Sequence, residues 1–164
     1  METRKFIHKL DLKIIKAITG AETINISLSG NAACLVAVSG SAGITIDSQG
    51  EIAFQVAINN GAGLLSVGAG PSILLTNAPA YSDLEGEAYI VGGSVSLKKG
   101  YGFDKVIMPN NYSASIYTLG WDLSLPFSSL FEEHGEVGNT YTLFHSNFYD
   151  FLESLKFKDV DECL

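Results

Sequence analysis

The densest group of residues able to do chemistry is the run Glu132-Glu133-His134-Gly135-Glu136, which combines carboxylates with an imidazole. Such side chains bind metals or exchange protons when a fold brings them together. The other histidines, His8 and His145, have no ligand spacing to this run or to the two cysteines, Cys34 and Cys163. We therefore expect a solvated loop at residues 132–136, no metal site and no cofactor.

A second group of carboxylates, Asp83, Glu85 and Glu87, lies around a predicted loop at residues 77–86. Acid–base catalysis by such a group needs a carboxyl whose pKa is raised by burial. An enzyme would hold Asp83, Glu85 or His134 in a deep pocket, and full exposure of these groups would remove that hypothesis. An exposed acidic loop explains the spacing, so we predict no catalytic residue and a protein that is not an enzyme.

The glycine-rich segments do not have the pattern of a phosphate-binding loop. Gly61-Ala62-Gly63 and Gly68-Ala69-Gly70 have no following helix and no lysine at the P-loop position. Gly40-Ser41-Ala42-Gly43 lacks the Gly-x-Ser-x-Gly spacing of a nucleophile elbow. Glycines at turns and strand bends explain these segments.

Aromatic side chains are concentrated in the second half of the chain, and they supply the candidate ligand-binding residues. These residues are Tyr101, Phe103, Tyr117 and Trp121. Aromatic groups commonly line apolar pockets. We predict that the four residues form a pocket or binding face for an apolar molecule or a protein; the alternative is that they pack within the core of the sheet.

The elements that must position these residues are β-strands. From residue 24 to residue 97 large apolar side chains alternate with small or polar ones, as in Ile52-Ala53-Phe54-Gln55-Val56-Ala57-Ile58. A period of two predicts strands with two unlike faces, and we expect the sheet to close around its apolar face. The fold class is mainly β: an antiparallel meander of about seven or eight strands over residues 23–146, forming a small barrel or a strongly curved sandwich.

Turns and helices complete the predicted architecture. Turn-forming residues predict reversals at residues 30–31, 47–50 and 59–61. Residues 3–19 have the spacing of an amphipathic helix stopped by Gly20, although a strand over residues 13–18 is the alternative. Asn147 is a candidate cap for a short C-terminal helix at residues 147–157.

Composition sets the class of protein. The chain has 164 residues, enough for one domain that we assign to residues 1–164, and only 17% of them are charged. A net charge of −8 with few clustered basic residues argues against nucleic-acid binding. The N-terminus lacks the apolar run of a signal peptide, and no apolar run reaches the length of a membrane-spanning helix. We expect a cytoplasmic protein or one exported by a route that reads no such signal.

One stretch is similar to a known group of proteins. It contains Gly43-Ile44-Thr45-Ile46-Asp47-Ser48-Gln49-Gly50, Thr76-Asn77-Ala78-Pro79 and Asp83-Leu84-Glu85-Gly86, the last of these ahead of Gly92-Gly93. Residues 39–97 thereby resemble glycine-rich β segments near the C-termini of bacterial Rhs-type polymorphic-toxin and related secreted proteins. The resemblance implies a bacterial origin and a role in an interbacterial or secreted system. It carries over no catalytic residue.

The sequence thus predicts a non-enzymatic β-barrel module that binds an apolar ligand or a protein partner, linked to a bacterial toxin or secretion system. The alternative is a membrane-inserting β-barrel or pore-forming protein, because strands of ~9–11 residues with an apolar outer face span a membrane. Membrane contact is the less favoured of the two, since several strand faces are interrupted by glycine and serine.

Overall fold

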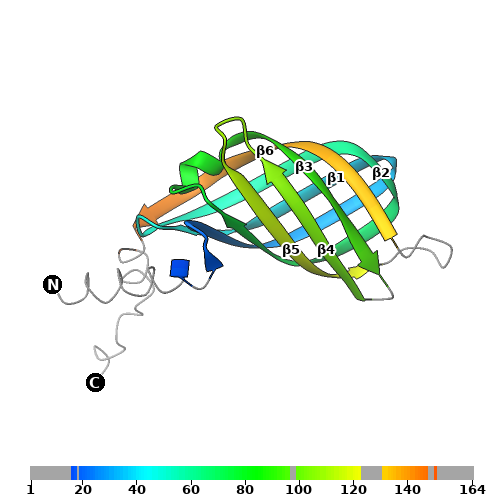
Figure 1. Ribbon diagram of the computed structural model, residues 1–164, viewed down its shortest axis with the longest axis horizontal. Coiled ribbons are helices and arrows are strands. Elements are labelled where there is room, and N and C mark those ends of the chain that lie inside the picture. The colour runs from blue at the N-terminus through cyan, green and yellow to red at the C-terminus, as the bar shows by residue number, and fades with distance from the viewer. Residues whose placement is uncertain (1–15, 18, 97–98, 123–130, 148–149, 151–164) are drawn as a thin grey trace, which may run out of the picture.

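The protein is a β-barrel in its computed structural model, which describes residues 16–17, 19–96, 99–122, 131–147 and 150 (Figure 1). A short 3-10 helix, η1 (Tyr81–Leu84), follows the second strand. The strands in chain order are β1 (Thr23–Asp47), β2 (Glu51–Thr76), β3 (Gly86–Ser96), β4 (Lys99–Ile107), β5 (Ser113–Asp122) and β6 (Phe131–Asn147).

The strands pair antiparallel throughout and close into a ring. The first half of β2 pairs with β6 and its second half with β5, while β4 and β3 link β5 to β6. β1 pairs with β2 along its whole length. The predicted antiparallel barrel is confirmed. The order β1-β2-β5-β4-β3-β6 differs from the predicted meander, because β2 pairs with three other strands.

β1 is long because it doubles back on itself. The side chains of Asn25 and Thr45 are hydrogen-bonded at 2.8 Å although they are 20 residues apart, a separation of about 66 Å in a straight strand. The reversal lies at the register shift between Ala33 and Leu35, where Leu35 has a left-handed backbone with φ of 69°. We call residues 32–36 the tip.

β2 follows the reversal of β1 and lies beside it. Its partner changes from β6 to β5 between Gly63 and Gly68, next to the tip. β1 and β2 therefore form a nested pair, which we call the double hairpin. The structure corrects two predicted turns: residues 30–31 and 59–61 lie within strands, and the reversals come a few residues later.

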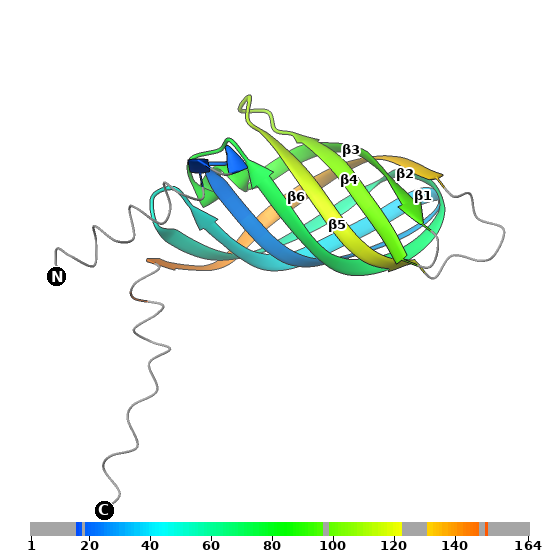
Figure 2. The same cartoon turned by 60° about the horizontal axis from the view of Figure 1, so that its bottom comes forward.

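The tip and η1 lie at opposite ends of the barrel (Figure 2). The Thr23 hydroxyl donates a hydrogen bond to the Ala78 carbonyl at 2.7 Å, and the Tyr81 backbone N–H donates to the Asp47 carboxylate at 3.1 Å. Both ends of β1 are therefore held beside η1. We call the two ends of the barrel the η1 end and the tip end.

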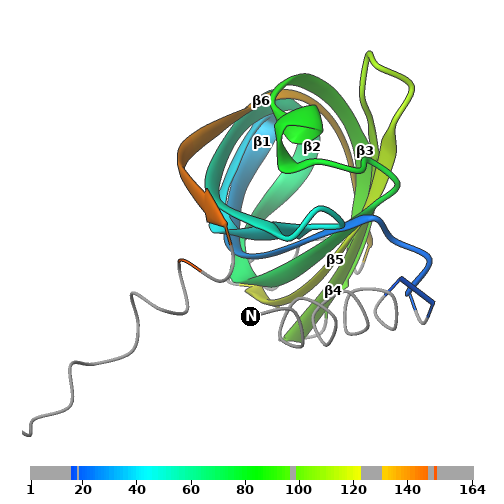
Figure 3. The same cartoon turned by 90° about the vertical axis from the view of Figure 1, so that its left-hand side faces the viewer.

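The strands enclose the interior of the barrel, which Figure 3 shows end-on. Their two faces differ in chemistry, and over most of the barrel the polar face is the inner one. On β1, Thr23 and Ser27 are buried, whereas Ile26, Leu28 and Val38 are 59%, 70% and 54% exposed. The expectation that the sheet closes around its apolar face is therefore wrong for most of the barrel. The narrow interior accepts small side chains, and alternation alone does not say which face is inside.

The η1 end has an ordinary apolar core inside the barrel. Its buried members are Ala78, Leu84, Ala88, Ile90, Val106, Met108 and Ala114, and Leu74, Tyr112 and Ile116 pack against them. They come from η1, the loops beside it and the adjoining ends of β2, β3, β4 and β5. The polar interior is therefore closed by packed side chains at this end.

A buried carboxylate secures the turn between β1 and β2. Asp47 is 1% exposed and accepts hydrogen bonds from the backbone N–H groups of Gln49 and Glu51, both at 2.9 Å, and of Tyr81. We expect Asp47→Ala to lower the free energy of unfolding by about 2–4 kcal/mol, because these donors lose their acceptor. Asp47→Asn, which keeps one acceptor oxygen, is expected to lose about half as much. Urea titration of both variants measures this, and equal stability of Asp47→Ala and the parent would contradict it.

The predicted helices fall mostly outside the described residues. Of the predicted helix at residues 3–19, the structure describes Lys16, Ala17 and Thr19, all with helical backbone, and the N–H of Gly20 donates to the Lys16 carbonyl at 2.8 Å. That helix stays a prediction. The C-terminal helix predicted at residues 147–157 also stays a prediction: Asn147 ends β6 and donates to Glu51, and the one other residue described in that range, Asp150, has helical backbone.

Candidate functional site

A cavity of about 160 Å³ lies inside the barrel, and all six strands contribute to its wall. The lining consists largely of glycine and small polar residues. Its polar members include Asn25, Ser27, Ser29, Asn31, Ser39, Ser41, Asn59, Ser72, Ser94, Asp104, Thr118, His134 and Glu136. Its apolar members are Val67, Ala69, Leu74, Ile90 and Ile116, so the wall offers a molecule both hydrogen-bonding and apolar contacts.

A contact between a histidine and a carboxyl group crosses one wall of this cavity. Asp104 on β4 and His134 on β6 are both the register partners of Gly92 on β3, one on each side. Gly92 has no side chain, so the two longer groups meet across it, with His134 Nε2 3.2 Å from Asp104 Oδ1. A Cβ at Gly92 would collide with the Asp104 carboxylate. The glycine is thus required by the pair that it separates.

A second carboxylate lies on the same side of β6. Glu136 is 6% exposed, and the Ser39 hydroxyl on β1 donates a hydrogen bond to it. The Asn59 amide on β2 donates in turn to Ser39 Oγ at 2.9 Å. This chain of contacts ties three strands together through the interior, so Glu136 is a buried charge with a polar partner.

Closer to the η1 end, a polar network fills the interior between the two arms of β1. Thr45 Oγ1 accepts from Asn25 and donates to Gln55 Oε1 at 2.6 Å. The Gln55 amide donates to the Tyr81 carbonyl at 3.0 Å and to Thr142 Oγ1 at 3.1 Å. These contacts satisfy buried polar groups and fix the relative position of the strands.

The predicted acidic run at residues 132–136 is not a loop. Its described side chains are divided by the strand β6: His134 and Glu136 face the interior, whereas Glu133 is exposed on the outer face. Among the residues described, no three histidine, cysteine or acidic side chains are arranged to hold a metal ion. Sequence reasoning missed one signal. Asp104, His134 and Glu136 each stand an even number of positions from the small or polar residues of their own strand that face inward, so they share the inner face.

The second group of carboxylates, Asp83, Glu85 and Glu87, lies at the η1 end and is not part of the cavity lining. Asp83 Oδ2 accepts the backbone N–H of Ala80 at 3.2 Å and so caps η1, while Glu85 and Glu87 are exposed. Slight burial, and then the charge of Glu85, raises the pKa of Tyr81. The role that geometry gives this group is structural.

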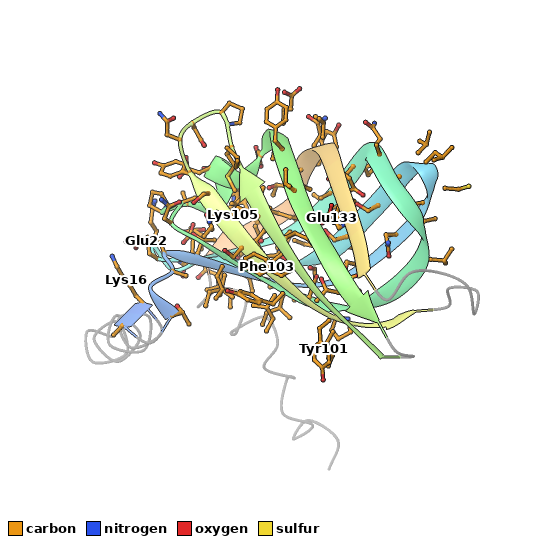
Figure 4. All side chains as sticks on the ribbon, turned by 45° about the vertical axis from the view of Figure 1, so that its right-hand side comes forward. Lys16, Glu22, Tyr101, Phe103, Lys105 and Glu133 are labelled. Atoms are coloured by element: carbon orange, nitrogen blue, oxygen red, sulfur yellow. The ribbon has the colours of Figure 1, made fainter. Side chains whose placement is uncertain are left out.

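Three of the four candidate ligand-binding aromatics lie on the outside of the barrel, and two of these, Tyr101 and Phe103, are labelled in Figure 4. Tyr101, Phe103 and Tyr117 are 68%, 49% and 51% exposed, and the rings of Phe103 and Tyr117 are 5.3 Å apart. The backbone of Trp121 lies in β5 as the register partner of Lys99, and its side chain is outside the described set. The structure thus joins Phe103 to Tyr117 on an outer face, away from the cavity lining.

Large apolar side chains cover the outside of every strand. The exposed set comprises Ile26, Leu28, Leu35, Val36, Val38, Ile44, Phe54, Ile58, Val67, Ile73, Tyr89, Val91, Tyr101, Phe103, Ile107, Tyr117, Leu119, Val137, Tyr141, Leu143 and Phe144. We call this set the outer belt. Within the described part of the chain, no helix has the length and hydropathy needed to cross a membrane.

Comparison with known proteins gives no relative for this chain. It matches no protein-family model, no curated protein and no solved structure. The resemblance of residues 39–97 to Rhs-type segments therefore stays a prediction.

Proposed function

We propose that this protein is a membrane-inserted β-barrel whose outer belt contacts lipid acyl chains. The observation that carries the proposal is the inverted polarity of the strands: large apolar groups outside, small polar groups and glycine inside. Membrane barrels have this arrangement, because their outer face meets lipid and their interior does not. In a water-soluble barrel the large apolar groups lie inside and the polar groups outside.

The extent of the outer belt favours lipid over a protein partner. Exposed apolar residues occur on β1 through β6, for example Leu28, Ile58, Val91, Phe103, Tyr117 and Leu143. A single partner covers one side of a barrel, whereas these residues surround it. Soluble monomers rarely expose apolar patches beyond a few hundred Å². A lipid phase that surrounds the barrel on all sides accounts for the outer belt better than a protein partner does.

Strand length and the placement of charge also support the proposal. β3, β4 and β5 have 11, 9 and 10 residues, the ~9–11 needed for a tilted strand to span a bilayer. On the outer face, Glu87 lies near the η1 end and Glu133 near the tip end. Lys105, between them, has a long stem that allows its amine to reach the headgroup region.

The interior makes an apolar cargo less favoured. The main cavity is lined by hydroxyls, amides, Asp104 and Glu136, and burial of such groups against an apolar ligand costs free energy. The apolar cluster at the η1 end leaves a second cavity of only about 80 Å³, and Asn25, Gln55 and Asn59 also line it. We therefore propose an embedded barrel with a closed polar interior rather than an open pore. Tyr101, Phe103 and Tyr117 become lipid contacts.

Flotation tests this proposal. The purified chain, diluted from denaturant or detergent into phosphatidylcholine vesicles, is expected to rise with the vesicles in a density gradient and to give the circular dichroism of a β-rich protein. Urea and carbonate washes, which strip peripheral proteins, are expected to leave it bound. A folded, monodisperse protein that stays at the bottom of the gradient, with no detergent present, would overturn the proposal.

A further inference from the structure

We propose that the barrel enters the membrane with the tip of the double hairpin leading and that the η1 end stays on the side of entry. This inference rests on the proposed function and adds a direction to it. It follows from the distribution of charge along the barrel axis and from the backbone geometry of the tip.

The double hairpin carries charge only at the η1 end. No charged residue occurs in residues 23–46 or in residues 52–76, and the two charges between them, Asp47 and Glu51, are at the turn beside η1. A charged group that enters the hydrocarbon core loses its hydration, which makes its entry unfavourable. The double hairpin can therefore enter lipid with its tip first without moving a charge.

The η1 end is acidic, which opposes its entry. Glu85 and Glu87 are exposed there, and Glu51 and Asp83 are half-buried in the same region. The charged residues of the tip end, Lys99, Asp122 and Glu133 among them, include both signs and belong to β4, β5 and β6. The lower barrier to entry is therefore at the tip end, along the double hairpin.

The tip is shaped to expose apolar groups. Cys34, Leu35 and Val36 are three consecutive exposed residues in a strand that otherwise alternates, with Leu35 81% and Val36 67% exposed. The left-handed φ of 69° at Leu35 produces this break in alternation, and such a conformation is costly for a branched residue. Strain that turns apolar side chains outward is consistent with contact between the tip and lipid.

The experiment labels the two ends separately and uses the full chain. Cys34 is exposed at the tip, so Cys163→Ser leaves a single thiol there for the fluorophore NBD. The matched control carries Cys34→Ser, Cys163→Ser and Ser82→Cys, which places the same probe on exposed η1. Ala32→Cys with Cys34→Ser and Cys163→Ser repeats the tip measurement two positions away. Each labelled protein is added to preformed phosphatidylcholine vesicles, floated, and exposed to dithionite, which reduces NBD but does not cross the bilayer.

The expected result is protection at the tip and none at η1: NBD at Cys34 and at Ala32→Cys keeps most of its fluorescence, and NBD at Ser82→Cys loses nearly all of it. Protection at Ser82→Cys, equal protection at both ends, or bleaching at both ends would overturn the direction proposed here while membrane insertion, shown by flotation, stands. Failure of every labelled protein to float would instead remove the proposed function itself.

Discussion

Arginine at both Leu28 and Ile58 is expected to remove the protein from lipid. Leu28 is 70% exposed and Ile58 is 61% exposed, and each lies near the middle of its arm of the double hairpin. An arginine near the bilayer midplane of a membrane barrel costs about 2–4 kcal/mol. Two of them are expected to reduce partitioning into vesicles by about a thousandfold or more. Flotation of Leu28→Arg/Ile58→Arg beside the parent protein measures this loss.

The control places the same two charges at the η1 end. Gln49 and Ser82 are exposed there, so Gln49→Arg/Ser82→Arg has the net charge of the belt variant without a charge in the belt. It is expected to float as the parent does. A belt variant that still floats, or one that becomes a more soluble and equally stable monomer, would show that the belt meets water or protein and not lipid.

The second large effect is expected from Gly43→Ala. Gly43 lies in the part of β1 after the tip, where it packs closely against the part before the tip. A Cβ at Gly43 would be 2.6 Å from the Ser27 Cα and closer still to the Ile26 carbonyl oxygen. Both obstacles are backbone, so rotation of a side chain gives no relief. We expect the variant to lose about 3–5 kcal/mol of unfolding free energy, a large part of the ~5–15 kcal/mol of a typical domain.

Gly135→Ala makes the same chemical change at a site with room for it. A Cβ at Gly135 has no heavy atom within 4 Å among the groups that surround it. Its stability is expected to stay within about 0.5–1 kcal/mol of the parent. Both variants are compared by urea titration in the medium in which the parent folds. Similar urea midpoints for the two variants would mean that the two halves of β1 do not pack as closely as the structure has them.

Alternation of side chains was sufficient to predict the fold class. It predicted strands, because a period of two over residues 24–97 fits no helix, and an antiparallel arrangement that left a barrel and a strongly curved sandwich open. It did not predict the topology. Asn59 and Gly61 resemble turn residues, yet Asn59 faces the interior and bonds to Ser39, and Gly61 continues the pairing with β6. Local turn propensity was overridden by contacts between distant strands.

The candidate site was harder to predict, because the alternation of side chains defines two faces of a strand without saying which of them faces inward. It shows that Ser27 and Leu28 face opposite ways and not which of them faces inward. Only the closure of the ring, with β2 between β5 and β6, puts the small residues inside. That same closure brings Asp104 and His134 together across Gly92 although they are far apart in sequence. The prediction that the protein is not an enzyme remains untested.

The central place of β2 in the ring has a consequence for how the chain is made. Among the strands that the structure describes, β6 is the last to leave the ribosome, and it pairs with the first half of β2 and with β3. Until it is present, both of those strands have unpaired edges, which invite aggregation. The ring closes only through contacts between residues far apart in sequence, and such topologies fold slowly. Synthesis of β6, and not the emergence of any one hairpin, is therefore the event that commits this barrel to its closed form.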